Sequence, residues 1–188
     1  MSSAQIDTSL PIRYVITGGP TSGKQAVFNA IRNTGIPCTE GEPAREIYRQ
    51  FKERLGRHLQ SGDRRDYSAE VLKAFVAEYC AHKRGIHFYN RGIPDGYGWD
   101  RFFGLSPSPE LQEASRVYRY DGIFILDPLD TFEDESGDVW AKDRELQRVH
   151  QLIIQGYYDT GYTPIFVPPD DADARLKFIL ANLPGRLS

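Results

Sequence analysis

The stretch Ile12–Ala30 contains a short apolar segment, Tyr14-Val15-Ile16-Thr17, followed directly by Gly18-Gly19-Pro20-Thr21-Ser22-Gly23-Lys24-Gln25. Residues 18–24 have the spacing G-x-x-x-x-G-K, which is typical of a loop that binds phosphate groups. Its glycines allow backbone N–H groups to line a concave surface, and a helix beginning there adds the positive end of its dipole. Lys24 supplies a positive charge for the β- and γ-phosphates. A glycine turn with a lysine by chance is less favoured, because strand, loop, lysine and helix follow in register.

One position departs from this pattern. After the lysine the loop normally carries Ser or Thr, whose hydroxyl ligates Mg²⁺, and this chain has Gln25. The amide of Gln25 is longer than a hydroxyl group, so we expect it to occupy space next to the metal. We therefore expect nucleotide binding by residues 18–25 with a weakened magnesium site.

Strand and helix patterns alternate along the whole chain. The predicted strands are 12–17, 36–39, 86–89, 122–126 and 163–167, and the predicted helices are 24–33, one from Pro43, 67–83, one capped by Ser108, one from near Asp143, and 171–183. This alternation predicts an α/β fold in three layers, a five-stranded parallel sheet with helices on both faces. We expect residues 1–10 to form a flexible tail and residues 11–188 to form one nucleotide-binding domain.

The composition excludes several classes of function. The 188 residues carry a formal net charge of −3 without a long basic run, so neither nucleic acid nor a membrane surface is an expected partner. No apolar run approaches the roughly 18 residues needed to span a bilayer. Residues 1–10 lack a signal pattern, and Cys38 and Cys80 are expected to be reduced thiols, which favours a cytoplasmic location.

Three motifs together resemble a known group: residues 16–24, Glu42-Pro43-Ala44-Arg45-Glu46, and Arg91-Gly92-Ile93-Pro94-Asp95. They are similar to the small single-domain P-loop ATPases and kinases related to the nicotinamide riboside kinase domain, with an AAA-like ATP-binding domain. The segments 126–129, 148–150 and 161–165 extend the resemblance over residues 12–183. It implies a P-loop fold that binds ATP and Mg²⁺ and transfers the γ-phosphate to a small-molecule acceptor. It does not imply which acceptor, and the oligomeric state stays open.

The resemblance also implies a metal position at the end of the third strand, where the group has Asp-Arg-Gly-x-x-Asp. This sequence has Asn90 in place of the first Asp, whereas Arg91, Gly92 and Asp95 match. An amide oxygen carries no charge, and Mg²⁺ prefers carboxylates and water. Asp95 is then expected to take over the metal or to act as a base, which makes Gln25, Asn90 and Asp95 the candidate metal positions. The alternative is a Gly-Pro turn with an Asx interaction.

Two further charged positions follow the second predicted strand. Parallel sheets bind ligands at the carboxyl ends of their strands, so Glu42 and Arg45 are expected close to residues 18–24. Glu42 is expected to hold a metal-bound water or the acceptor hydroxyl, and Arg45 to contact an anionic group of the substrate. The alternative is a helix N-terminus that favours acidic residues.

The remaining candidates lie in the second half of the chain. Residues 127–143 contain seven acidic side chains and one lysine, from which we expect a mobile lid that brings Arg144 to the transferring phosphate. The equally favoured alternative is that Arg144, Lys142 and Arg148 form a solvated helix face. Trp99 is a candidate to stack on the acceptor, although aromatic stripes more often belong to a core. The histidines, which show no metal-ligand spacing, are expected to be structural or exposed: His58, His82, His87 and His150.

Two functions remain open. The first is an ATP-dependent phosphotransferase with Arg45, Arg91 and Trp99 at the acceptor; its catalytic residues would be Lys24, Glu42, Arg91, Asp95 and Arg144. The second is a nucleotide-binding module with weak or no catalysis and a regulatory or partner-binding role, which Gln25 and Asn90 favour. A switch GTPase is disfavoured because the chain has no Asn-Lys-x-Asp motif.

Overall fold

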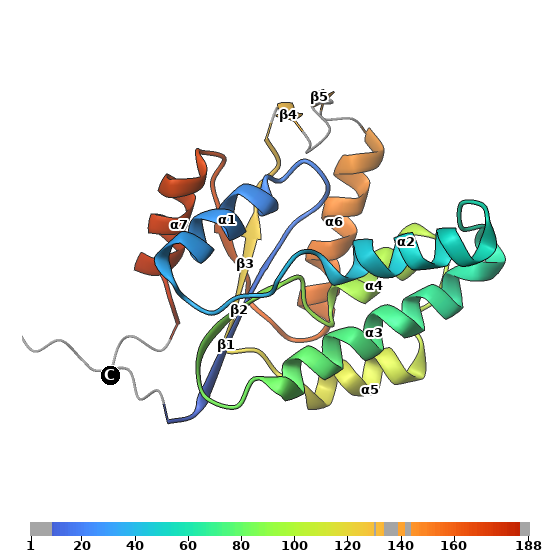
Figure 1. Ribbon diagram of the computed structural model, residues 1–188, viewed down its shortest axis with the longest axis horizontal. Helices are drawn as coiled ribbons and strands as arrows, with labels where there is room; N and C mark the ends of the chain where they lie inside the picture. Colours follow the sequence, from blue (N-terminus) through green and yellow to red (C-terminus); the bar gives the residue numbers. More distant parts are fainter. Residues whose placement is uncertain (1–8, 130, 134–138, 142–143, 185–188) are drawn as a thin grey trace, which may run out of the picture.

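The computed structural model describes residues 9–129, 131–133, 139–141 and 144–184 (Figure 1). Its strands are β1 (Pro11–Thr17), β2 (Gly85–Asn90), β3 (Gly122–Leu126), β4 (Thr131–Glu133), β5 (Val139–Ala141) and β6 (Ile165–Val167). Its helices are α1 (Lys24–Thr34), α2 (Pro43–Leu55), a 3₁₀ turn η1 (Ser61–Asp63), α3 (Arg64–Ala81), α4 (Asp95–Phe102), α5 (Pro109–Val117), α6 (Arg144–Asp159) and α7 (Ala172–Ala181). None of these described helices combines the length and apolar character that crossing a membrane requires.

The main sheet is parallel, with the strand order β2-β1-β3-β6. Figure 1 shows α1 and α7 on one face and α6 with α2–α5 on the other. Side chains of β1 alternate between two buried clusters: Tyr14 and Ile16 pack with α1 and α7, and Val15 packs with α4 and α6. The α/β class with helices on both faces is therefore confirmed, and β1, which leads into residues 18–24, lies inside the sheet.

The predicted strand at residues 36–39 is wrong, because the described sheet has four strands and this segment is not one of them. Only one bridge, Cys38 with Phe88, joins residues 36–39 to β2. Pro37 has no N–H to donate to a ladder. At the other end, Asn90 N donates to the hydroxyl of Thr39 at 2.9 Å instead of to a main-chain carbonyl, so the pairing stops there.

Two other segments differ from the sequence expectation. Residues 95–102 form α4, which two glycines in its sequence obscured. Within the acidic segment, β4 and β5 pair as an antiparallel hairpin directly before α6 (Figure 1), so this segment contains regular secondary structure. Residues 130, 134–138 and 142–143 lie outside the described residues, and closure of a lid stays a prediction.

Helices α4 and α6 approach each other closely because of two glycines. A Cβ added at Gly98 would lie 2.7 Å from the Ile153 Cα and N atoms. On the facing helix, a Cβ added at Gly156 would lie 2.8 Å from Pro94 O. The backbone of α4, and with it Trp99 and Asp100, is thus fixed against α6.

We predict that Gly98→Ala destabilises the protein by about 1–2 kcal/mol, since backbone overlap outweighs the gain in helix propensity. Gly96→Ala in the same helix is the matched control. Its Cβ would meet only side-chain atoms of Leu111, the nearest at 2.9 Å, and these can move. Urea denaturation measures both free energies of unfolding, and equal values for the two variants would contradict this packing argument.

Candidate active site

A cavity of about 890 Å³ opens at the carboxyl edge of the sheet and extends between α2, α3 and α4. The residues expected at the site gather on its wall: Pro20, Thr21, Ser22, Gly23, Lys24, Gln25, Glu42, Arg45, Asn90, Arg91, Asp95 and Trp99. Arg144 does not line this cavity; it lies exposed at the first residue of α6. The sequence therefore placed most of the candidate residues around one cavity, with the expected lid cation outside it.

The loop of residues 18–24 turns its carbonyl oxygens toward the protein. Gly18, Thr21 and Gly23 have φ values of 148°, 63° and 71°, which bend the loop back on itself. Thr21 O accepts from Leu129 N at 3.1 Å, and Ser22 O accepts from Arg175. By contrast, the N–H groups of residues 21–25 have no acceptor among the described residues. Such a concave set of amides favours an anion.

Lys24 closes the concave side of this loop. Its ammonium group donates to Gly18 O at 3.0 Å, to Gly19 O at 3.1 Å and to Ser22 Oγ at 3.2 Å. The side chain is only 8% exposed. Burial, together with the nearby Arg91 cation, lowers the pKa of Lys24 to about 7. An anion in the loop would restore the charged form of this lysine.

His150 of α6 contacts the same loop, which the sequence did not predict. Its Nδ1 accepts a hydrogen bond from Gly19 N at 3.1 Å, and the side chain is buried. A Cβ added at Gly19 would lie 2.9 Å from the His150 Cβ, so glycine is required there by the closeness of α6. The first half of α6 and the phosphate loop are therefore in direct contact.

Arg91 is a buried cation on the wall of the cavity. Its Nε donates to Glu42 at 2.9 Å, and its Nη1 lies 3.2 Å from both Asp95 Oδ1 and Gly18 O. The guanidinium also lies 5.5 Å from the centre of the Trp99 ring. Although burial opposes it, the two carboxylates raise the pKa of Arg91 above its ordinary value. Burial likewise opposes ionisation of Glu42, but Arg91 and Lys24 outweigh it and lower the pKa of Glu42 to about 2.

Asp95 is fully engaged by the protein. Its Oδ1 accepts from Thr17 Oγ1 at 2.6 Å and from Arg91, and its Oδ2 accepts from Gly92 N at 2.9 Å and from the Tyr157 hydroxyl at 2.5 Å. A carboxylate has about four lone-pair sites, so these donors use all of them. The geometry therefore favours a role in holding Arg91 over the expected role as base or metal ligand.

The side chains expected near the metal differ in their hydrogen bonds. Gln25 does not fill the space beside the loop as expected, because its Nε2 turns along α1 to Asn29 Oδ1 at 3.3 Å. Asn90 donates to Gly41 O at 2.7 Å, and its buried Oδ1 has no partner among the described residues. The second oxygen of Glu42 accepts no hydrogen bond from a described residue.

These oxygen atoms fit a magnesium ion that is held mainly by phosphates, the usual mode for Mg²⁺ in such sites. No group of three or more Asp, Glu, His and Cys side chains within the described residues would hold a metal alone. Asn90 Oδ1 and the second oxygen of Glu42, which accept no hydrogen bond from a described residue, would be available to such an ion.

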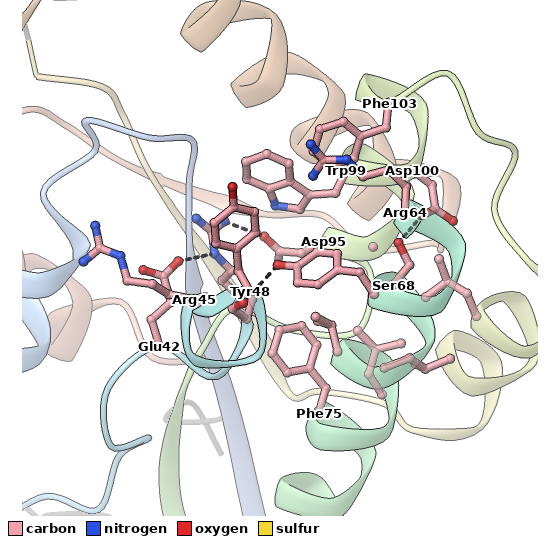
Figure 2. A pocket seen from close by; sticks show the side chains of 18 of the residues that line it. Glu42, Arg45, Tyr48, Arg64, Ser68, Phe75, Asp95, Trp99, Asp100 and Phe103 are labelled. Carbon is pink, nitrogen blue, oxygen red and sulfur yellow. Dashed lines mark hydrogen bonds and ion pairs between the residues drawn. The ribbon is translucent and has the colours of Figure 1, made fainter. Parts of the chain in front are cut away.

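Aromatic side chains form the far half of the cavity. Figure 2 shows Trp99, Phe103, Tyr48 and Phe75 around it, with Arg45 on the opposite side from Asp100. The Trp99 and Phe103 rings are nearly parallel, with centres 5.9 Å apart.

Buried Asp100, which the sequence did not single out, connects the helices that carry this half of the cavity. It accepts from Ser68 Oγ at 2.8 Å and from Arg65 at 3.2 Å, and burial raises its pKa. These contacts join α3 to α4.

Comparison with known families decides the classification. The model of the AAA domain family matches residues 13–175. The chain belongs to this family. A search of curated proteins found no match. The family match and the solved structures, which include the NadR protein, confirm the expected resemblance to a small P-loop kinase-like domain.

Solved structures similar to this AAA domain include two kinases and the NadR protein. Deoxyadenosine kinase from M. mycoides with bound dATP has a TM-score of 0.60 at 12% identity, over 92% of this chain and 99% of that chain. Thymidylate kinase from Ehrlichia chaffeensis has a TM-score of 0.57 at 14% identity, over 91% and 98%. NadR in complex with NR has a TM-score of 0.57 at 16% identity, over 95% of this chain and 54% of that chain. At these identities the likeness establishes a P-loop kinase-like fold.

We predict that ATP binding at pH 8 takes up a proton, because Lys24 with a pKa of about 7 is then largely neutral and phosphate favours its charged form. Affinity should accordingly fall as the pH rises above 7. Calorimetric titrations in two buffers with different ionisation heats measure the uptake. Lys24→Arg, which stays charged, is the control without uptake. Equal heats in the two buffers for the natural protein would contradict the lowered pKa.

Proposed function

We propose that this protein binds ATP on residues 18–25 and transfers the γ-phosphate to a hydroxyl group of a small-molecule acceptor. The observation that carries this proposal is that one cavity is lined by the phosphate loop, by Arg91 and by the aromatic side chains of its far half. Phosphoryl transfer depends mainly on positioning and charge neutralisation, which such an arrangement supplies.

Each residue near the loop has a distinct role in this proposal. The amides of residues 21–25 and the ammonium of Lys24 bind the phosphates. Arg91, fixed by Glu42 and Asp95, stabilises the charge on the transferring group. Glu42 orients the acceptor hydroxyl with its second oxygen; with a pKa of about 2 it is a weak base, and a loose transition state requires little proton abstraction. Arg144 would join them only through movement of the segment before α6.

The proposed acceptor carries a planar ring. Trp99 and Phe103 offer aromatic surface, and Arg45 lies on the opposite side of the cavity for a polar or anionic group. The similar structures include a deoxyadenosine kinase, a thymidylate kinase and the NadR protein in complex with NR, which supports a nucleoside-like acceptor. Magnesium, when bound, would neutralise charge on the phosphates, and Asn90 and Glu42 are the residues that would hold it.

We predict that purified protein with ATP and Mg²⁺ phosphorylates at least one member of a nucleoside panel, detected by mass spectrometry.

Lys24→Ala should weaken ATP binding by about 1.5–3 kcal/mol in calorimetry, the range for hydrogen bonds to charged groups. Lys177→Ala, at an exposed position of α7, is the control and should bind as the natural protein does. Unchanged affinity in folded Lys24→Ala would remove the phosphate loop from the proposal.

A second candidate is a nucleotide-binding module with little chemistry, and Gln25 and Asn90 favour it. Both positions offer only amide groups where a hydroxyl and a carboxylate would fix the ion. A weakly held Mg²⁺ would reduce the stabilisation of the transition state more than it reduces the affinity for the nucleotide. The two candidates therefore differ in turnover and not in affinity.

We predict that Gln25→Thr combined with Asn90→Asp raises Mg²⁺-dependent turnover about tenfold or more, which corresponds to about 1.4 kcal/mol in the barrier. Each single change should give less than the pair, because both act on one ion. Steady-state rates over a range of magnesium concentrations measure this. Fast turnover with tight magnesium dependence in the natural protein would instead exclude the module with little chemistry.

A further inference from the structure

Arg175 of α7 is a buried cation in contact with the phosphate loop. It is 1% exposed and is the largest fully buried side chain among the described residues. Its guanidinium donates to Ser22 O at 2.5 Å, to Asp127 O at 2.8 Å and to Pro168 O at 3.0 Å. All three acceptors are main-chain carbonyls.

These carbonyls come from three separate segments at the carboxyl edge of the sheet. Ser22 belongs to the phosphate loop, Asp127 follows β3, and Pro168 follows β6. One planar guanidinium thus fixes the loop relative to the ends of two strands, which a flexible ammonium could not do with the same geometry. The loop is also closely fitted against it, since a Cβ added at Gly23 would lie 3.4 Å from Arg175 Nη1.

Arg175 has no ion-pair partner among the described residues. Asp127 and Asp170 act on it only through longer-range attraction. Burial lowers its pKa from the ordinary value. Burying a cation without a counter-ion is costly. An anion bound on the adjacent amides would offset part of that cost.

We propose that Arg175 is a positioning residue for the phosphates of the bound nucleotide. By holding the Ser22 carbonyl inward, it directs the amides of residues 21–25 into the cavity. Its positive charge also strengthens the potential that attracts the phosphates. This inference rests on the proposed binding of a nucleotide by the same loop.

The competing explanation is that Arg175 only stabilises the fold. Arg119 provides a comparison, because it also donates to two main-chain carbonyls, Ser115 O at 3.0 Å and Thr160 O at 2.8 Å, away from the phosphate loop. A residue with a purely structural role would lower the melting temperature without changing the affinity of the folded protein for phosphates.

The test is calorimetric titration of ATP and of inorganic tripolyphosphate into the natural protein, Arg175→Met, Arg175→Lys and Arg119→Met, with thermal denaturation of each. Arg175→Met should lose affinity for both ligands by about tenfold or more, and Arg175→Lys, which keeps the charge, should lose less. Arg119→Met should bind within about twofold of the natural protein.

Natural affinity in folded Arg175→Met would overturn the proposal, as would failure of both Arg175 variants to fold, which would assign the residue to the fold alone. If the natural protein binds neither ligand, the proposed nucleotide binding itself fails, and this result is distinct from the others.

Discussion

The buried guanidinium of Arg91 is the interaction on which the site depends. Removing either Glu42 or Asp95 would leave a poorly compensated cation in a nearly water-free position, which is strongly unfavourable. The same side chain reaches Gly18 O of the phosphate loop and the face of Trp99. Since Glu42 precedes α2 and Asp95 begins α4, satisfying one cation positions both helices that border the acceptor half of the cavity.

Helix α6 connects the two halves of the cavity. In its first half His150 accepts from the phosphate loop, and near its end Tyr157 donates to Asp95. Burial and the carboxylate raise the pKa of Tyr157 well above its ordinary value, so this hydroxyl remains a donor. Between them, the close approach at Gly98 fixes α4. The β4–β5 hairpin leads into this helix, so movement there would act on the loop and on the acceptor walls together.

The sequence predicted what depends on local pattern and missed what depends on distant contacts. The loop of residues 18–24 and the alternation of strands and helices depend on residues that are close together in the sequence, and the structure has both where they were expected. The sequence could not show that the Asp95 carboxylate is already hydrogen-bonded, because its donors Thr17 and Tyr157 are far away in the chain. Arg175 and His150 reach the loop only after the sheet assembles. The predicted strand at residues 36–39 failed for a local reason, since Pro37 lacks the donor that a ladder needs.

The central claim is that the loop amides, Lys24 and Arg91 form one phosphate-transfer site. A crystal structure with a non-hydrolysable ATP analogue tests it most directly. The account predicts phosphates on the N–H groups of residues 21–25, with Lys24 Nζ moved from the Gly18 and Gly19 carbonyls to the phosphates and Arg91 still held by Glu42 and Asp95. An analogue bound outside this cavity, or Lys24 unchanged beside bound phosphates, would contradict it.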